Sequence, residues 1–219
     1  MEQVTVKVLL LGDIGVGKST LAYHLTHAHL PAAALPPTLS VDLPPATVRV
    51  LEDMEVEVKV QLVDVPGNTT FAPVLPAFYR GANVLMLVYD VTRPATFRAV
   101  ETRWLGEIDR WAPEDALLIL IGNKLDGDIL TQAPAKRAVS KEDGQALGKR
   151  IGAVAFYEIS GLTWTHDDLV TMLDATLALA VKICQKTRAT ASALATAGEV
   201  RRLAVSSSSN QGACCGAAS

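Results

Sequence analysis

The chain has 219 residues, of which 49% are hydrophobic and 20% charged, and its formal net charge is −3. This length suits one domain with an appended tail or two small domains, and the negative balance argues against a general nucleic-acid binder, which is normally basic. The first residues do not resemble a signal peptide, no apolar run approaches the roughly 18–20 residues of a membrane span, and three cysteines are too few for a disulfide framework, so a cytosolic protein is expected.

The first predicted strand leads directly into a glycine-rich loop. The apolar run 6–11 is typical of a strand buried on both faces, and the pattern G-x-x-x-x-G-K-S and a helix start follow it. Glycines let a backbone wrap closely around phosphate oxygens, Lys18 can contact the β- and γ-phosphates, and the Ser19 hydroxyl can ligate Mg²⁺. A strand before and a helix after disfavour a chance glycine-rich turn, so the stretch predicts a nucleotide-binding protein. The residues expected around the phosphates are Asp13, Ile14, Gly15, Val16, Gly17, Lys18, Ser19 and Thr20.

A second motif follows a predicted hairpin. The first helix is expected to end near His29, because prolines follow closely. Segments 47–51 and 56–63 alternate apolar and polar residues and predict an antiparallel hairpin that ends in Asp64-Val65-Pro66-Gly67. A carboxylate at a strand end before a glycine turn can hold Mg²⁺ and sense a γ-phosphate. D-x-x-G alone is usually a strand-ending turn, but about 50 residues after a phosphate loop the functional interpretation is favoured.

The middle of the chain predicts two helices around one strand. Residues 71–80 indicate a short irregular helix, and residues 84–90 a buried strand. Residues 94–111 predict a helix, because their apolar side chains fall at helical spacing on one face. Its tryptophans, Trp104 and Trp111, are expected to be packed in or beside the core.

The next strand delivers a third motif. Residues 116–122 predict a buried strand, followed by Asn123-Lys124-Leu125-Asp126. A carboxylate can accept from both guanine N1–H and the 2-amino group, whereas adenine would leave it unsatisfied. The Lys124 stem can cover the base face, and Asn123 can tie loops together. N-K-x-D is weak alone, but ligands bind at the carboxyl ends of strands in open α/β sheets, so as the third such motif it indicates guanine specificity.

The remaining segments complete a doubly wound α/β fold. Ser140 predicts a helix N-cap with the helix running to about Arg150, residues 153–159 predict the last strand, and a final helix opens near Trp164. We therefore expect a mostly parallel six-stranded sheet with helices on both faces. The predicted nucleotide-binding domain covers 1–188.

The predicted tail covers 189–219. It is rich in Ala, Ser and Thr and is expected to be flexible, with a transient helix possible over 193–204. From residue 182 onward five basic residues oppose one acidic residue, a net charge of +4 that leaves −7 for the rest of the chain. Such a basic extension indicates attraction to a negatively charged surface.

Together these motifs resemble the Ras superfamily of small GTPases across residues 4–185, and most closely its Rab branch. The similar segments are Thr38–Leu43 to T-I-G-V-D-F, Phe78–Ala82 to Y-Y-R-G-A, Val88–Thr92 to V-Y-D-V-T and Trp104–Ile108 to W-L-x-E-I. The paired Cys214 and Cys215 look like a Rab geranylgeranylation site.

The resemblance implies a role for each motif. Lys18 would contact the β- and γ-phosphates, and Gly67 would bond the γ-phosphate. Mg²⁺ would be held by Ser19, Thr38 and, through water, Asp64. The residues implied to hold guanine are Asn123, Lys124, Asp126, Ser160, Gly161 and Leu162.

The chain also departs from the Rab pattern. Where Rab proteins usually read D-T-A-G-Q, this chain ends the motif with Asn68, which replaces the water-orienting glutamine. Ile14 puts a branched side chain where Rab proteins often have a small residue, and Leu162 replaces the lysine of S-A-K. Four residues follow Cys215, more than Rab tails commonly have. These departures indicate a divergent member.

The sequence therefore predicts a monomeric Rab-like GTP/GDP switch in vesicle trafficking that requires Mg²⁺. Lys18 and Asn68 are the expected catalytic residues, and hydrolysis is expected to be slow. Effectors, exchange factors and activators would be its partners, and the prenylated tail would hold it on the cytoplasmic face of an intracellular membrane. The alternative is a GTP-binding scaffold with little or no turnover. A nucleotide kinase is disfavoured, because the sequence shows neither a lid nor an acceptor-binding arginine cluster.

Overall fold

The computed structural model describes residues 2–27, 47–51, 55–67, 75–125, 136–160 and 164–208, with side chains in the last helix described to residue 187. Six strands form one sheet in the order β2-β3-β1-β4-β5-β6. Their bounds are β1 Glu2–Leu11, β2 Thr47–Leu51, β3 Val56–Asp64, β4 Val84–Asp90, β5 Leu117–Asn123 and β6 Ala155–Glu158.

The sheet is mostly parallel, as the sequence predicts. β1 runs parallel to both β3 and β4, and β4, β5 and β6 continue in the same direction, while β2 pairs antiparallel with β3 at one edge. All residues of β4 and β5 are buried, which explains why these strands are apolar runs without alternation. The predicted doubly wound fold and the edge hairpin are therefore confirmed.

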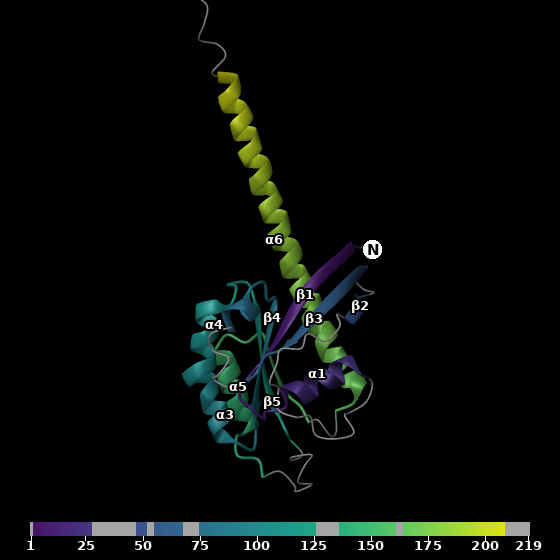
Figure 1. The fold of residues 1–219 in the computed structure, drawn as a ribbon, viewed down its shortest axis with the longest axis vertical. Helices are drawn as coiled ribbons and strands as arrows, with labels where there is room; N and C mark the ends of the chain where they lie inside the picture. The colour runs from purple at the N-terminus through teal and green to yellow at the C-terminus, as the bar shows by residue number, and fades with distance from the viewer. Residues whose placement is uncertain are drawn as a thin grey trace, which may run out of the picture. The chain divides into compact units, whose positions relative to one another are not determined.

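Helices cover both faces of the sheet (Figure 1). α1 lies on one face, and α3, η3, α4 and α5 lie on the other, where their apolar residues join the core over β1, β4 and β5. The helix bounds are α1 Lys18–Thr26, α2 Leu75–Tyr79, α3 Pro94–Ala99, η3 Val100–Trp104, α4 Leu105–Trp111, α5 Lys141–Arg150 and α6 His166–Ser208. α1 ends earlier than predicted, and the expected N-cap of α5 is confirmed, because Ser140 Oγ accepts the Asp143 N–H at 3.0 Å.

The helix predicted over 94–111 is present, but it contains a π-helical turn. The N–H of Leu105 donates to the carbonyl of Val100, five residues earlier, instead of to the residue four earlier. Val100 and Trp104 are fully buried, whereas Trp111 is 40% exposed. Apolar spacing alone predicts a regular helix here, because it reports which face is buried and not how many residues each turn holds.

The last helix continues to Ser208, beyond the predicted domain end at 188. The chain divides into two compact units, Met1–Ala180 and Val181–Ser219. The sequence predicts a flexible tail from 189 with a transient helix over 193–204, and the structure has helix as far as Ser208. Alanine is the strongest helix former, and the segment is rich in it. No helix in the described part of the chain is both long and apolar enough to cross a membrane. Cys214 and Cys215 lie outside the described residues.

Candidate nucleotide-binding site

The glycine-rich loop joins the end of β1 to the start of α1. Gly12, Gly15 and Gly17 have φ angles of 136°, 74° and 99°, a region that side chains disfavour. A Cβ on Gly12 would lie 2.1 Å from the carbonyl oxygen of Val88, and one on Gly17 would lie 2.3 Å from Asn123 Nδ2. The loop backbone can therefore have this path only with glycine at both positions, as the phosphate-loop motif predicts.

Lys18 reaches back across this loop from the first turn of α1. Its Nζ donates to the carbonyls of Gly12 at 2.8 Å and Asp13 at 3.0 Å, and the residue is only 6% exposed. Burial lowers the pKa of Lys18 from 10.5 to about 8, against the opposing charges of Asp64 and Asp13. The ammonium group is thus held inside the loop, where it can neutralise phosphate.

Ser19 and Asp64 bring two side-chain oxygen groups together from distant segments. The Ser19 hydroxyl donates to Asp64 Oδ2 at 2.5 Å, which joins the start of α1 to the end of β3. Mg²⁺ prefers oxygen ligands and is usually bound by one or two protein groups together with phosphates and water. These residues fit Mg²⁺; the third predicted ligand, Thr38, lies outside the described residues.

Gly67 lies directly against the phosphate loop. A Cβ at this position would be 2.5 Å from Asp13 C and 2.6 Å from both Gly12 O and Ile14 N. The structure therefore places Gly67, the glycine of D-x-x-G, in contact with the phosphate loop. Asn68 lies outside the described residues.

The opposite end of the site is formed where β4, β5 and β6 end. Asn123 Nδ2 donates to the Val16 carbonyl at 2.9 Å, so the first residue of N-K-x-D is bound to the phosphate loop. Lys124 Nζ lies 3.3 Å from Asp90 Oδ2, and Ser160, just after β6, is 1% exposed. Asp126, Gly161 and Leu162 lie outside the described residues.

A family model described as the Ras family matches residues 7–176. The chain belongs to the Ras family. Within it the chain is Rab-like. It is 37% identical over 166 residues to Ras-related protein Rab-26 from Homo sapiens, covering 76% of this chain and 60% of that one. It is 33% identical over 181 residues to Ras-related protein RabC from Dictyostelium discoideum, covering 80% and 87%. It is 36% identical over 154 residues to Ras-related protein SEC4 from Candida albicans (strain WO-1), covering 70% and 68%. The chain thus spans about 60% of the length of the mammalian Rab-26 relatives it matches.

In this Ras-family chain the side chain of Asp13 is bound by the neighbouring helix, which the sequence did not predict. Trp104 Nε1 donates to Asp13 Oδ1 at 2.9 Å, and Arg103 lies 3.7 Å from the same oxygen. Arg103 also donates to the Gly67 carbonyl at 3.2 Å. A buried tryptophan usually needs an acceptor for its N–H, so the sequence could have predicted that Trp104 has a hydrogen-bond partner. It does not say which group that partner is.

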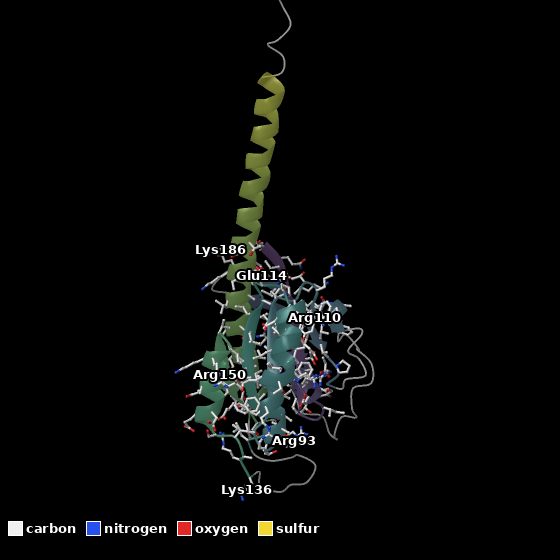
Figure 2. All side chains as sticks on the ribbon, turned by 90° about the vertical axis from the view of Figure 1, so that its left-hand side faces the viewer. Arg93, Arg110, Glu114, Lys136, Arg150 and Lys186 are labelled. Atoms are coloured by element: carbon white, nitrogen blue, oxygen red, sulfur yellow. The ribbon has the colours of Figure 1, made fainter. Side chains whose placement is uncertain are left out.

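Asp90 and Arg93 form a second set of contacts at the site that the sequence did not predict. Burial alone would raise the pKa of Asp90. Hydrogen bonds from the Thr92 hydroxyl and amide, the charge of Lys124 and a hydrogen bond from Arg93 hold this pKa below its ordinary value. Arg93 donates from Nε to Asp90 at 2.9 Å and from its other end to the Ile14 carbonyl at 3.2 Å. Figure 2 shows Arg93 at the end of the domain where the chain leaves β4 and β5. This arginine therefore connects the end of β4 to the phosphate loop.

Proposed function

We propose that this chain is a Rab-like GTP/GDP switch that binds guanine nucleotide with Mg²⁺ and acts in intracellular membrane trafficking. The observation that supports this most is the phosphate loop, with the buried ammonium of Lys18 inside it and the Ser19–Asp64 oxygen pair beside it. The similarity to Rab-related proteins supports the choice among nucleotide-binding functions.

Each group has a defined task in this proposal. The loop amides and Lys18 bind the phosphates, and Ser19, Thr38 and Asp64 hold Mg²⁺, which supplies positive charge to the phosphate oxygens. Gly67 senses the γ-phosphate with its backbone N–H, and Asn123 holds the base-binding segment against the loop. Asp126 reads guanine, with Lys124 and the segment Ser160–Leu162 beside the base.

Binding measurements test this proposal directly. Asp126 accepts from the guanine edge, so GTP and GDP should bind far more tightly than ATP. Asp126→Asn should weaken GTP tens- to thousands-fold and improve xanthosine triphosphate, since each lost charge-assisted bond costs about 1.5–3 kcal/mol. Asp128→Asn, the same change outside the motif, is the matched control and should leave the order of the nucleotide affinities unchanged. Equal GTP and ATP affinity by calorimetry would contradict the proposal.

We also propose slow GTP hydrolysis. Asn68 is one methylene shorter than glutamine, and a misplacement of about 1 Å can cost about 10²-fold, on top of an intrinsic family rate near 10⁻⁴ s⁻¹. Ile14 is 54% exposed on the phosphate loop, where it can obstruct an arginine supplied by an activator. Asn68→Gln should raise the single-turnover rate, and adding Ile14→Gly should restore the response to an activator. An ordinary wild-type rate that Asn68→Ala leaves unchanged would contradict this and show that another group orients the water.

A scaffold that binds GTP with little turnover is the second candidate, and the replacement of glutamine by Asn68 is the observation that favours it. The same single-turnover assay, with and without an activator, separates the two. A switch converts its bound GTP within the assay once the activator is added, whereas a scaffold does not.

Membrane attachment is proposed through double prenylation of Cys214 and Cys215. One lipid chain binds membranes only marginally, whereas two chains, or one chain with basic residues, hold stably. The protein would act as a monomer on the cytoplasmic face of an intracellular membrane, with effectors and exchange factors as partners. Replacing both cysteines by serine should release it to the cytosol, and mass spectrometry finding both thiols free would contradict the proposal.

A further inference from the structure

Arg103 contacts two parts of the site that are far from it in the sequence, Asp13 in the phosphate loop and Gly67. Its Nη1 donates to the Gly67 carbonyl at 3.2 Å and lies 3.7 Å from Asp13 Oδ1. Its Nε donates to Glu107 Oε1 at 3.0 Å, and its guanidinium lies 4.3 Å from the ring centre of Trp104. A guanidinium is planar and presents its donors in a fixed fork, so these contacts fix its orientation.

The π-helical turn explains how two consecutive residues reach the same carboxylate. In a regular α-helix, neighbouring side chains diverge by about 100°, since 3.6 residues complete a turn. Leu105 bonds to Val100, and the wider turn that results lets Arg103 and Trp104 point in more similar directions. Both then contact Asp13 Oδ1. Such turns are frequent at functional sites.

The position of Asp13 in the phosphate loop explains why its carboxylate needs these contacts. A carboxylate within a loop that must bind phosphate would repel the ligand, unless it is turned away and neutralised. The hydrogen bond from Trp104 turns the Asp13 carboxylate toward the helix, and the charge of Arg103 neutralises it. Arg103 also bonds to Gly67, which lies against the same loop. The guanidinium therefore binds the carbonyl of Gly67 at the place where this residue lies against the phosphate loop.

Arg103, Glu107 and Tyr79 form a cluster, because Arg103 bonds to Glu107 and both charges act on the Tyr79 hydroxyl. This cluster has hydrogen-bonding atoms that are not used. Among the described residues, Arg103 Nη2, Glu107 Oε2 and the Tyr79 hydroxyl are buried atoms with no hydrogen-bond partner. Buried polar groups of this kind favour any rearrangement that pairs them. Because Arg103 also bonds to Gly67, a movement of Gly67 would change how these groups can pair.

We propose that Arg103 is a positioning residue that sets the preference of this protein for GTP over GDP. The inference rests on the proposed function, in which the Gly67 N–H bonds the γ-phosphate that GDP lacks. The Gly67 carbonyl belongs to the peptide group that follows this N–H. By holding that carbonyl, Arg103 restricts rotation about the backbone bonds of Gly67 and so limits where its N–H can lie before the nucleotide arrives. Without Arg103 the backbone at Gly67 must be ordered on binding, and this cost falls on GTP and not on GDP.

Dissociation constants for GDP and a non-hydrolysable GTP analogue test the proposal in Arg103→Met. The loss of one charge-assisted hydrogen bond predicts about tenfold weaker analogue binding, with GDP changed by less than about twofold. Arg110→Met is the matched control, because the Arg110 guanidinium on α4 lies over the ring of Trp111, 4.8 Å from its centre, much as that of Arg103 lies over Trp104. This control should bind both nucleotides as the wild type does.

Arg103→Lys keeps the charge but not the fork, so it should lose most of the same preference, and it also serves if the methionine variant does not fold. A lysine variant with the wild-type preference would overturn the proposal, because charge beside Asp13 would then be sufficient. Equal weakening of both nucleotides, or no change in either, would also overturn it.

Tryptophan fluorescence gives a readout that does not depend on hydrolysis. Replacing Trp111 and Trp164 by phenylalanine leaves Trp104 as the one tryptophan of the chain. Its emission should differ between the GDP and GTP-analogue states, and Arg103→Met should remove the difference. Emission that is identical in the two states would overturn the inference, whereas a wild-type protein that binds neither nucleotide would overturn the proposed function itself.

Discussion

The phosphate loop and the ends of β4 and β5 border the same site, but they are held in different ways. The loop is one run of eight residues, 12–19, in which Lys18 bonds to carbonyls five and six residues away. Asn123, by contrast, bonds to Val16 across 107 residues. Backbone conformation fixes the first region, and side chains brought together by the sheet fix the second. Changes to the loop backbone should therefore have the larger effects.

The largest effect is expected for Gly12→Ala. A Cβ would lie 2.1 Å from Val88 O at a φ of 136°, so the loop or β4 must move and the domain should lose several kcal/mol of unfolding free energy. Gly106→Ala is the matched control: nothing lies within 4 Å, and alanine in a helix should be neutral or stabilising by up to about 1 kcal/mol. Urea unfolding measures both. Equal stabilities would show that the loop backbone is not the rigid part of the site.

Asn123→Ala should have the next largest effect. It removes the bond to Val16 O from a residue that is 5% exposed and leaves that carbonyl unsatisfied, at a cost of about 1–3 kcal/mol. Nucleotide affinity should fall about five- to hundredfold by calorimetry. Asn83→Ala is the control, because Asn83 accepts the Lys7 N–H at the other end of β4 and should affect stability alone. An equal loss of nucleotide affinity in both variants would contradict the view that only the carboxyl ends of the strands border the nucleotide site.

Nucleotide affinity and folding stability should change in opposite directions when the pH is raised through the pKa of Lys18. Its pKa in the folded protein is lowered from 10.5 to about 8, so between these values the unfolded chain binds more protons. The burial of this charge destabilises the nucleotide-free protein below pH 8, and that penalty is relieved as the pH rises toward 10.5. Phosphate needs the ammonium form, so nucleotide affinity should fall above pH 8, by up to about tenfold per pH unit.

Lys18→Met supplies the control for the pH experiment. Relative to this variant, the stability of the wild type should rise with pH over that window while its affinity falls. If stability and affinity instead fell together, Lys18 would not be the group that titrates.

The smallest effect is expected for Arg93→Gln. Arg93 connects Asp90 to the Ile14 carbonyl, and the Asp90 side chain is 1% exposed, but that of Arg93 is 44% exposed. Thr92 and Lys124 still bind Asp90 without Arg93, so the loss should be about 1 kcal/mol or less. Nucleotide dissociation, measured by stopped flow, should accelerate by less than about fivefold, and less still at high salt. A change as large as that of Asn123→Ala would make this surface connection part of the rigid site.

Local patterns determined much of this protein. The apolar runs of β4 and β5, the N-cap at Ser140 and the glycines of the phosphate loop were all predictable, because burial, capping and positive φ each act on a few neighbouring residues. The order of the three motifs also predicted which strand ends would meet. Thr38, Asn68, Asp126, Gly161 and Leu162 stay predictions from the same patterns, since they lie outside the described residues.

Only the tertiary structure decided how the parts of the site are connected. The sequence predicts that Trp104 is buried, but its bond to Asp13 and the contact of Arg103 with Gly67 depend on how η3 packs over the phosphate loop. The π-helical turn has the same origin. Apolar spacing in the sequence is satisfied by either kind of turn, and the choice depends on contacts with segments that are distant in the chain.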